Sequence, residues 1–419
     1  MAGLNPRRLD NLARTFRFSS SFRTQPLNVT LSRARAVARQ LGISRVTDIT
    51  RLDCIGVPVF ASIRPEAHPG SLCVNAGKGI TLAEARVGAY MEAVEYAFAE
   101  YNRASLKVRV VPARDVYEGR RRPDSILDFC PVMGAEIDLD APIACVAATD
   151  IKSGETFLTP AELTFLPFPP HPVGNRYFGS SSNGLCSGNS VLEATVHGLA
   201  EVIERDICSF QAFKDKSVVV SNSSLPAKIR KIEATLSSVG MKLYVRYLDN
   251  EFDVPYFMAV VAESKTDDPI YISVGYGCNL SSRIALTRAV CEALQSRLSF
   301  IHGGRDDLVE RYARFEGWTR NARADYAEKL VTEVSRNGTS LEFDHIRNRS
   351  RPPADLKSAQ DRLLRALAKN GFKHALRVIY TPKNFPLQVV RILVPGLECF
   401  NETTARVGVR LRNYVKEQL

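Results

Sequence analysis

Acidic residues at one repeated spacing are the feature of this chain that most clearly suggests chemistry. Two segments, 109 residues apart, superpose without a gap: Gly79-x4-Glu84-Ala-x6-Glu92-x-x-Glu95 and Gly188-x4-Glu193-Ala-x6-Glu201-x-x-Glu204. On a helix of about 3.6 residues per turn, acids so spaced lie near one face. Like charges in this arrangement destabilise a helix unless a cation balances them. Mg²⁺ is the natural cation, because it takes carboxylate oxygens together with substrate phosphates.

An ordinary surface helix is the alternative explanation for these acids, which would then pair with Arg86 or Arg205. Exposed pairs of that kind contribute little to stability. A single E-x-x-E segment would favour this alternative. Two copies in register, each after a glycine turn, favour the cation site instead.

A third stretch adds positive charge. Arg288, Glu292 and Gln295 are separated by four and three residues, so they lie on one face of a helix. Arginine suits phosphate because its planar guanidinium donates two hydrogen bonds at once. The alternative is an i,i+4 surface ion pair between Arg288 and Glu292.

The segment from Ser180 to Ser190 is small, polar and punctuated by glycine, and it leads directly into a long apolar-periodic stretch. Backbone N–H groups at the start of a helix bind anions, so a phosphate could lie there. The chain has no G-x-x-x-x-G-K-[ST] motif, which excludes a nucleotide site of the P-loop type. A flexible Ser/Gly linker is the alternative.

The elements that must position these residues alternate along the chain. Apolar periodicity predicts helices at residues 31–41, 82–101, 191–213, 283–302 and 306–341, and a last helix from 403 to the end. Strand-like patterns occur at residues 57–63, 108–111, 143–148, 242–247, 256–261, 271–275, 375–380 and 389–394. This order predicts an α/β (mixed α+β) fold.

Composition limits the class of protein. The chain has 419 residues, 45% hydrophobic and 24% charged, which is enough for a large core. No apolar run approaches the roughly 18 residues of a membrane span, and no apolar signal region follows the start. Nine cysteines without C-x-x-C argue against disulfides or a thiolate zinc site, and six histidines without H-E-x-x-H or i,i+4 pairing indicate no transition-metal site. We expect a cytoplasmic protein.

Net charge is the remaining compositional signal. A charge of +11 suggests an anionic partner. The arginines are spread along the chain and no nucleic-acid-binding motif is present, so we expect no specific nucleic acid partner.

Read together, three segments of the chain resemble the signature segments of the YcaO family. They are Gly77-Lys78-Gly79 with Glu92-x-x-Glu95, Ser182-Asn183-Gly184 with Gly198-Leu-x-Glu201-x-Ile-Glu204-Arg205, and Arg288-Ala-x-x-Glu292-Ala-x-Gln295-Ser296-Arg297. The resemblance extends to Arg64-Pro65 and to Val394-Pro395-Gly396-Leu397-Glu398, so it covers about residues 23–400. It implies a YcaO-like fold.

The resemblance also implies a ligand set, with ATP bound through two magnesium ions. The implied metal-facing acids are Glu92, Glu95, Glu201, Glu204 and Glu292. The implied ATP contacts are Arg23, Thr30, Arg33, Ser182, Asn183, Arg205, Arg288 and Glu292, and we expect catalytic roles for Glu201, Glu204 and Arg288. The expected organisation is a flexible basic tail, residues 1–22, before one catalytic domain, residues 23–419, with a signature core at about 70–400.

Family members activate a peptide backbone amide by transferring the γ-phosphoryl of ATP to its oxygen, which makes an azoline or, with external sulfide, a thioamide. Tyr96 stands where the family commonly has Arg, and the end of the chain lacks the Pro-x-Pro-x-Pro of azoline-forming members. The resemblance therefore favours thioamide formation on a ribosomally made peptide or protein, with a sulfide donor and a TfuA-like partner. It also allows a homodimer.

Two other functions remain open. A non-catalytic accessory subunit could use the same fold to bind a peptide or ribosomal protein substrate for a partner enzyme. A nucleic-acid-binding role is suggested by charge alone and would show affinity that falls smoothly with salt.

Overall fold

The computed structural model describes residues 16–17 and 20–418, apart from 104, 119–120, 170–173, 264–265, 309–311, 337, 339, 350–351 and 403. Of the basic tail expected at residues 1–22, residues 1–15 and 18–19 therefore lie outside the described residues. Strand β1 (Phe16–Arg17) pairs antiparallel with β2 (Phe22–Arg23).

Three larger antiparallel sheets form the framework. One has the order β10 (Val218–Val219), β11 (Met241–Tyr247), β12 (Tyr256–Glu263), β13 (Ser273–Cys278). A second has the order β3 (Arg45–Asp48), β4 (Val59–Ile63), β5 (Val74–Lys78). The third has the order β6 (Val108–Pro112), β7 (Pro142–Asp150), β14 (Leu376–Ile379), β15 (Gln388–Leu393), β9 (Leu185–Gly188), with β8 (Thr156–Pro160) beside β7.

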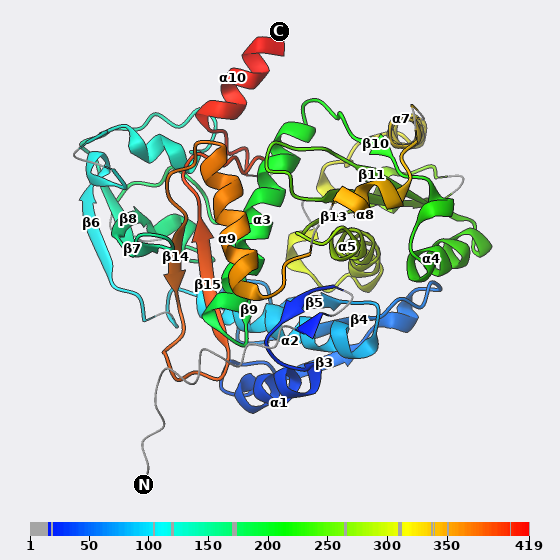
Figure 1. Cartoon of the computed structure of the whole chain (residues 1–419), viewed down its shortest axis with the longest axis horizontal. Helices are drawn as coiled ribbons and strands as arrows, with labels where there is room; N and C mark the ends of the chain where they lie inside the picture. Colours follow the sequence, from blue (N-terminus) through cyan, green and yellow to red (C-terminus); the bar gives the residue numbers. More distant parts are fainter. Residues whose placement is uncertain are drawn as a thin grey trace.

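Each of these sheets passes into a long helix. Strand β5 is followed by α2 (Leu82–Ala99), β9 by α3 (Val191–Gln211), and β13 by α5 (Ser282–His302). Figure 1 shows α3 and α5 in the middle of the molecule, with α2 beneath them. The three strand–helix units therefore meet at the centre, and the mixed α/β fold class is confirmed.

Glycines let these helices lie directly on their strands. A Cβ at Gly77 of β5 would lie 2.0 Å from the Ala89 backbone nitrogen of α2. A Cβ at Gly277 of β13 would lie 2.0 Å from the Ala285 carbonyl oxygen of α5. Real Cβ atoms do not approach this closely, so only glycine allows the observed contact between strand and helix.

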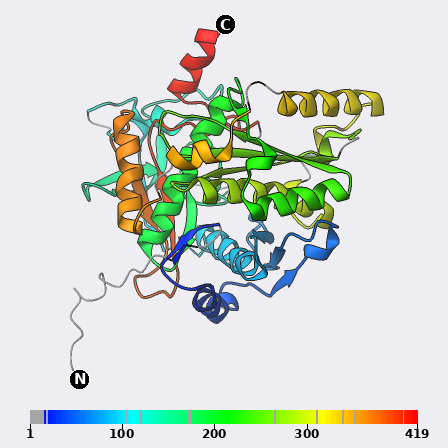
Figure 2. The same cartoon turned by 45° about the vertical axis from the view of Figure 1, so that its right-hand side comes forward.

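The remaining helices cover this centre. Helix α1 (Leu27–Ala38) packs on α2 through Ala34 and Val37, and α9 (Leu356–Lys369) packs its buried leucines against α3. Figure 2 shows α9 alongside α3 from a second direction. Helices α4 (Ala227–Ser238) and α8 (Phe343–Arg349) join the core of the β10–β13 sheet. Sequence patterns did not predict α4, α8 or α9.

Two expected helices differ from the structure. The helix predicted at 306–341 is represented by α7 (Arg320–Ser335), with a short 3-10 turn at Asp306–Leu308. The last helix, α10, spans Val409–Gln418 and does not begin at 403. Glu398 explains this start, because its carboxylate accepts hydrogen bonds from the backbone N–H of Gly408 (2.6 Å) and Leu411 (2.9 Å). A distant carboxylate therefore caps α10, which periodicity cannot reveal.

Candidate functional site

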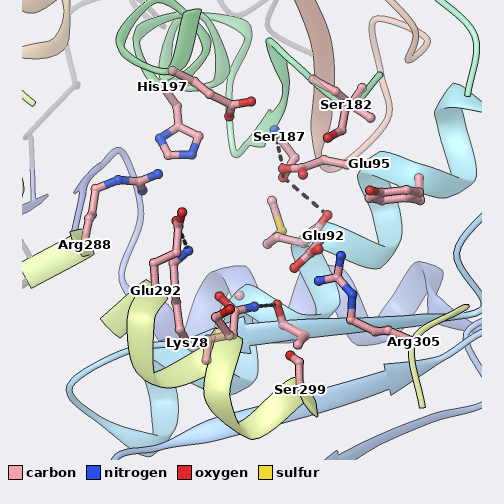
Figure 3. Close-up of a pocket in the computed structure, with 18 of the residues that line it drawn as sticks. Lys78, Glu92, Glu95, Ser182, Ser187, His197, Arg288, Glu292, Ser299 and Arg305 are labelled. Carbon is pink, nitrogen blue, oxygen red and sulfur yellow. Dashed lines mark hydrogen bonds and ion pairs between the residues drawn. The ribbon is translucent and has the colours of Figure 1, made fainter. Parts of the chain in front are cut away.

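A pocket of about 430 Å³ lies where α2, α3 and α5 meet. Carboxylates from all three helices line it, and Figure 3 shows several of them turned toward one another. They are Glu92, Glu95, Glu201, Glu204 and Glu292. The acids expected to face metal thus converge on one cavity, although their helices are far apart in the sequence.

The pocket is built from three copies of the same unit. Residues 88, 92 and 95 of α2 correspond to 197, 201 and 204 of α3 at an offset of 109, and to 288, 292 and 295 of α5 at a further offset of 91. All nine of these positions line the pocket. The repeated acidic spacing revealed only two copies, because the third carries Gln295 where the others carry glutamate. Continuing the spacing into α5 would have revealed the third copy.

In each unit, a residue at or near the end of the strand binds a glutamate that belongs to another unit. The Ser187 backbone N–H of β9 donates to Glu95 of α2 (2.8 Å). The Cys278 backbone N–H of β13 donates to Glu204 of α3 (2.8 Å). Lys78 of β5 forms an ion pair with Glu292 of α5 (2.6 Å). The strand ends 78, 187 and 278 are equivalent positions, so these contacts form a closed ring around the pocket.

Burial raises the pKa of three of these acids. Desolvation raises the pKa of Glu92 and of Glu204. Desolvation also raises the pKa of Glu95 to about 8, although its hydrogen bonds from Ser187 act in the opposite direction. Carboxylates that resist ionisation in the apo pocket are those expected to gain most from a bound cation.

Positive side chains line the same pocket: Arg23, Lys78, Arg205, Arg288 and Arg305. Burial opposes the ionisation of Glu292, but Lys78, Arg205 and Arg288 outweigh it and lower its pKa to about 2. The ion pair of Glu292 is with Lys78, so the surface pair considered for Arg288 and Glu292 is not what the structure shows. Arg205 does pair with Glu204 (3.4 Å), yet Glu204 is buried and both residues line the pocket.

Arg305 is a pocket residue that sequence analysis missed. It follows α5 outside the three segments, and Figure 3 shows its guanidinium turned toward Glu92. Burial raises the pKa of Glu92 and of Tyr96, and the charge of Arg305 opposes this rise in both. Tyr96 occupies the position where an arginine was expected, and Arg305 brings a guanidinium to the same place. Nothing in its sequence surroundings indicates this position.

The segment from Ser180 to Ser190 contains strand β9, and it is not a free loop. Ser182 lines the pocket, whereas Asn183 faces a neighbouring cavity that also contains Glu201 and Arg205. The expectation of free N–H groups for phosphate is wrong at two residues, because Gly184 donates to Glu201 (3.1 Å) and Ser187 to Glu95. These donors hold acids in place.

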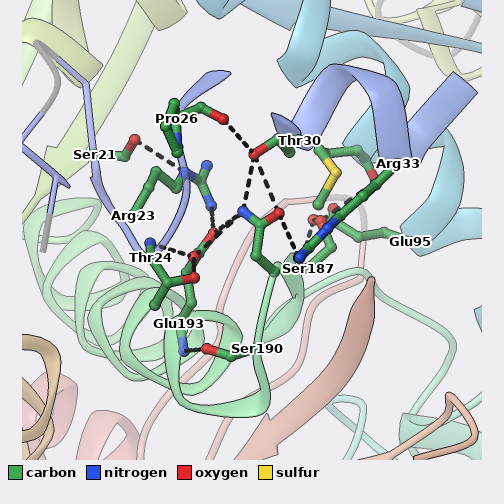
Figure 4. A network of polar contacts seen from close by, with 12 residues as sticks. Ser21, Arg23, Thr24, Pro26, Thr30, Arg33, Glu95, Ser187, Ser190 and Glu193 are labelled. Atoms are coloured by element: carbon green, nitrogen blue, oxygen red, sulfur yellow. Dashed lines mark hydrogen bonds and ion pairs between the residues drawn. The ribbon is translucent and has the colours of Figure 1, made fainter. Parts of the chain in front are cut away.

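Three residues near the N-terminus were expected to contact ATP, and one of them lines the pocket. Arg23 lines the pocket and pairs with Glu193 (3.1 Å). Thr30 and Arg33 instead contact the side-chain oxygen of Asn189, at 3.2 and 3.4 Å (Figure 4). The described lining of the pocket includes neither Thr30 nor Arg33. Both side chains are thus hydrogen-bonded to the turn before α3.

Comparison with known proteins identifies the family of this chain. Residues 76–398 match the family model described as YcaO cyclodehydratase, ATP- and Mg²⁺-binding. The chain belongs to the YcaO family. The family resemblance seen in the sequence is therefore confirmed, and ATP and Mg²⁺ are the ligands named for the family.

Two relatives and one solved structure illustrate the relationship of this YcaO protein. An uncharacterized protein of Methanothermobacter thermautotrophicus is 32% identical over 90% of this chain and 94% of its own. An uncharacterized protein in the tfuA 3′ region of Rhizobium leguminosarum bv. trifolii is 30% identical over 92% and 91%. The structure of YcaO from Methanopyrus kandleri bound with AMPPCP and Mg²⁺ has a TM-score of 0.70, with 23% identity over 93% and 95%.

Among the helices within the described ranges, none is both long enough and apolar enough to cross a bilayer.

Proposed function

We propose that this YcaO protein uses ATP and Mg²⁺ to phosphorylate the oxygen of a peptide backbone amide. The observation that carries the proposal is the convergence of five carboxylates and five cationic side chains on one pocket. Hard carboxylate oxygens beside lysine and arginine are the groups that a magnesium-bound triphosphate requires. The residues of the pocket therefore fit the ligands named for the family.

We assign the metal to the five glutamates, with Glu201 and Glu204 as the acids nearest to the chemistry. Bound Mg²⁺ would supply positive charge to the phosphate oxygens. Arg205 and Arg288 can donate hydrogen bonds to the same oxygens, and Lys78 holds Glu292 ionised. The pocket thus positions groups and balances charge, which is the main work in phosphoryl transfer.

The oxygen of an amide is a poor leaving group, and phosphorylation turns it into a good one. A sulfur or oxygen nucleophile adds to the amide carbon, and the oxyanion formed takes the γ-phosphoryl group, which releases ADP. The carbon–oxygen bond then breaks and phosphate leaves. The product is a thioamide when sulfide is the nucleophile and an azoline when a neighbouring side chain attacks.

We favour a thioamide product and a TfuA-like partner protein. The support is the relative in the tfuA 3′ region, which aligns over 92% of this chain. The substrate is then a ribosomally made peptide or protein, and a separate donor delivers the sulfide. Cytoplasmic location and a homodimer remain predictions.

Release of ADP and phosphate tests this function. It should depend on Mg²⁺, on a candidate peptide and on the partner. Glu201→Gln should abolish turnover, because a neutral amide in its place neither balances cation charge nor takes a proton. Glu233→Gln on the exposed side of α4 is the matched control and should retain full activity. ATP that binds but stays intact with every peptide and partner would favour an accessory subunit instead.

A further inference from the structure

Three side chains of different chemistry meet at one wall of the pocket. Cys186 lies on β9, and His197 and Glu201 lie on α3. One ligand atom from each residue, a thiol sulfur, an imidazole nitrogen and a carboxylate oxygen, lies within 4.8 Å of the other two. The sequence patterns predicted no transition-metal site, because the chain contains neither H-E-x-x-H nor C-x-x-C.

Local geometry explains how these three side chains meet. His197 and Glu201 are four residues apart, so they lie on one face of α3. Strand β9 runs against that helix, and its buried Cys186 points to the same face. Glu201 accepts the Gly184 N–H with Oε1 (3.1 Å) and the Cys186 thiol with Oε2 (3.4 Å), so sulfur and carboxylate oxygen already lie in contact.

The sulfur–oxygen distance matches that of a tetrahedral metal site. Zinc bonds of about 2.3 Å to sulfur and about 2.0 Å to oxygen place the two ligand atoms roughly 3.5 Å apart. The observed 3.4 Å is close to this value. Thiolate and imidazole are ligands of zinc and related borderline metals, whereas Mg²⁺ prefers oxygen alone.

We propose that Cys186, His197 and Glu201 form a three-ligand site for a divalent metal ion of the zinc class. On binding, the thiol proton leaves to solvent and a sulfur–metal bond forms. Because His197 and Glu201 line the pocket, the fourth coordination position opens into it. Three protein ligands with one open position are typical of zinc sites that bind an exchangeable ligand. The proposal goes beyond amide activation and needs neither ATP nor a peptide. It shares Glu201 with the proposed magnesium site, so the two ions use this carboxylate alternately.

Cobalt is the probe, because Co²⁺ replaces zinc and reports its ligands by absorption. The full chain, stripped of metal with a chelator, is titrated with Co²⁺ alone. We expect one equivalent to bind with an intense near-ultraviolet thiolate band and with the strong visible absorption of a four-coordinate ion. Excess Mg²⁺ should not remove the thiolate band.

Two cysteine variants make the test specific. Cys186→Ser should lose the thiolate band and should weaken Zn²⁺ binding by more than the roughly 10–100-fold that follows loss of a ligand's outer hydrogen-bond partner. Cys208→Ser is the control, because this thiol contacts the Tyr256 hydroxyl (3.1 Å) and lies outside the three-ligand set. Circular dichroism checks that both variants are folded.

The outcomes separate this proposal from the proposed function. A weak six-coordinate cobalt spectrum, or a thiolate band that survives in folded Cys186→Ser, would overturn the metal site. Peptide-dependent ADP release in that case would leave the amide-activating function intact. A thiolate band lost only in Cys186→Ser establishes the site, whatever the enzyme assay shows.

Discussion

At the scale of single residues, Arg305 shows how a pocket obtains charge from outside its repeated helices. Its guanidinium donates to Asp307 through Nε (3.0 Å) and Nη2 (2.7 Å), and its charge also acts on Glu92 and Tyr96 from the segment after α5. A cation at this place can balance a metal-binding acid or contact a phosphate. Under the proposed function, either role would make nucleotide binding depend on a residue that no motif contains.

Substitution of Arg305 tests this role. Arg305→Gln should raise the KM for ATP about 10- to 100-fold, since a hydrogen bond to a charged group contributes about 1.5–3 kcal/mol. Steady-state kinetics with a fixed peptide measures the effect. Arg314→Gln is the matched control, because Arg314 is half exposed and pairs with Glu402 at the surface. An equal KM in both variants would remove Arg305 from the site.

The buried carboxyl of Glu95 is a second single residue with a testable effect, here on how stability depends on pH. Burial raises its pKa in the folded apo protein to about 8, above the ordinary value of 4.5. Between these two values the folded state holds a proton that the unfolded state has lost, so the free energy of unfolding falls as pH rises.

The apo protein should therefore melt at a lower temperature at pH 8 than at pH 5.5. Glu95→Gln should reduce this difference, because glutamine cannot titrate. Thermal melts of both proteins at the two pH values provide the measurement. A pH dependence unaffected by the substitution would show that other groups cause it.

At the scale of elements, backbone contacts between strands and helices position the acids. Gly277 of β13 and Gly77 of β5 lie against α5 and α2 with no room for a side chain. The acids project from the same helices, so their places in the pocket depend on these contacts. The donors at the strand ends bind these acids, and the same packing of strand against helix places those donors.

Gly277→Ala should destabilise the protein by about 1–3 kcal/mol or more, the usual cost of overpacking. The new Cβ would lie 2.0 Å from the Ala285 carbonyl oxygen, so α5 would have to move as a whole. Urea denaturation measures the change. Gly338→Ala is the control, because among the described residues no atom beyond its own chain neighbours lies within 4 Å of its added Cβ. Equal stabilities would mean that β13 and α5 adjust freely.

At the scale of the whole molecule, the pocket closes a ring of three units. The first helix is held by the second strand, the second helix by the third strand, and the third helix by the first strand. Because the ring is closed, ligand binding in the middle should stabilise all three sheets together. A ligand that binds only the folded state adds about 2.7 kcal/mol at one hundred times its Kd.

Hydrogen exchange can detect this coupling. Mg²⁺ with a non-hydrolysable ATP analogue should slow exchange at Gly184, Ser187 and Cys278, whose N–H groups donate to pocket acids. Exchange in α7, which lies outside the ring, should change little. Slowing confined to a single unit would contradict a closed ring.

Much of the site follows from local geometry that a sequence displays. The spacing of Glu92 and Glu95, and of their counterparts on α3, places them on one helix face because the helical repeat is constant. The same spacing carries the family resemblance, and strand and helix patterns indicate the α/β class. Helices α2, α3 and α5 accordingly lie close to their predicted ranges.

Long-range packing accounts for the rest. The pairing of Lys78 with Glu292 joins residues 214 positions apart, and Arg305 enters the pocket from a segment without periodicity. Glu398 sets the start of α10, and β9 brings Cys186 to His197. Such contacts depend on how whole elements pack, which residue spacing along one helix or strand does not encode. Composition and spacing thus revealed which acids could share a cation, whereas packing chose their partners.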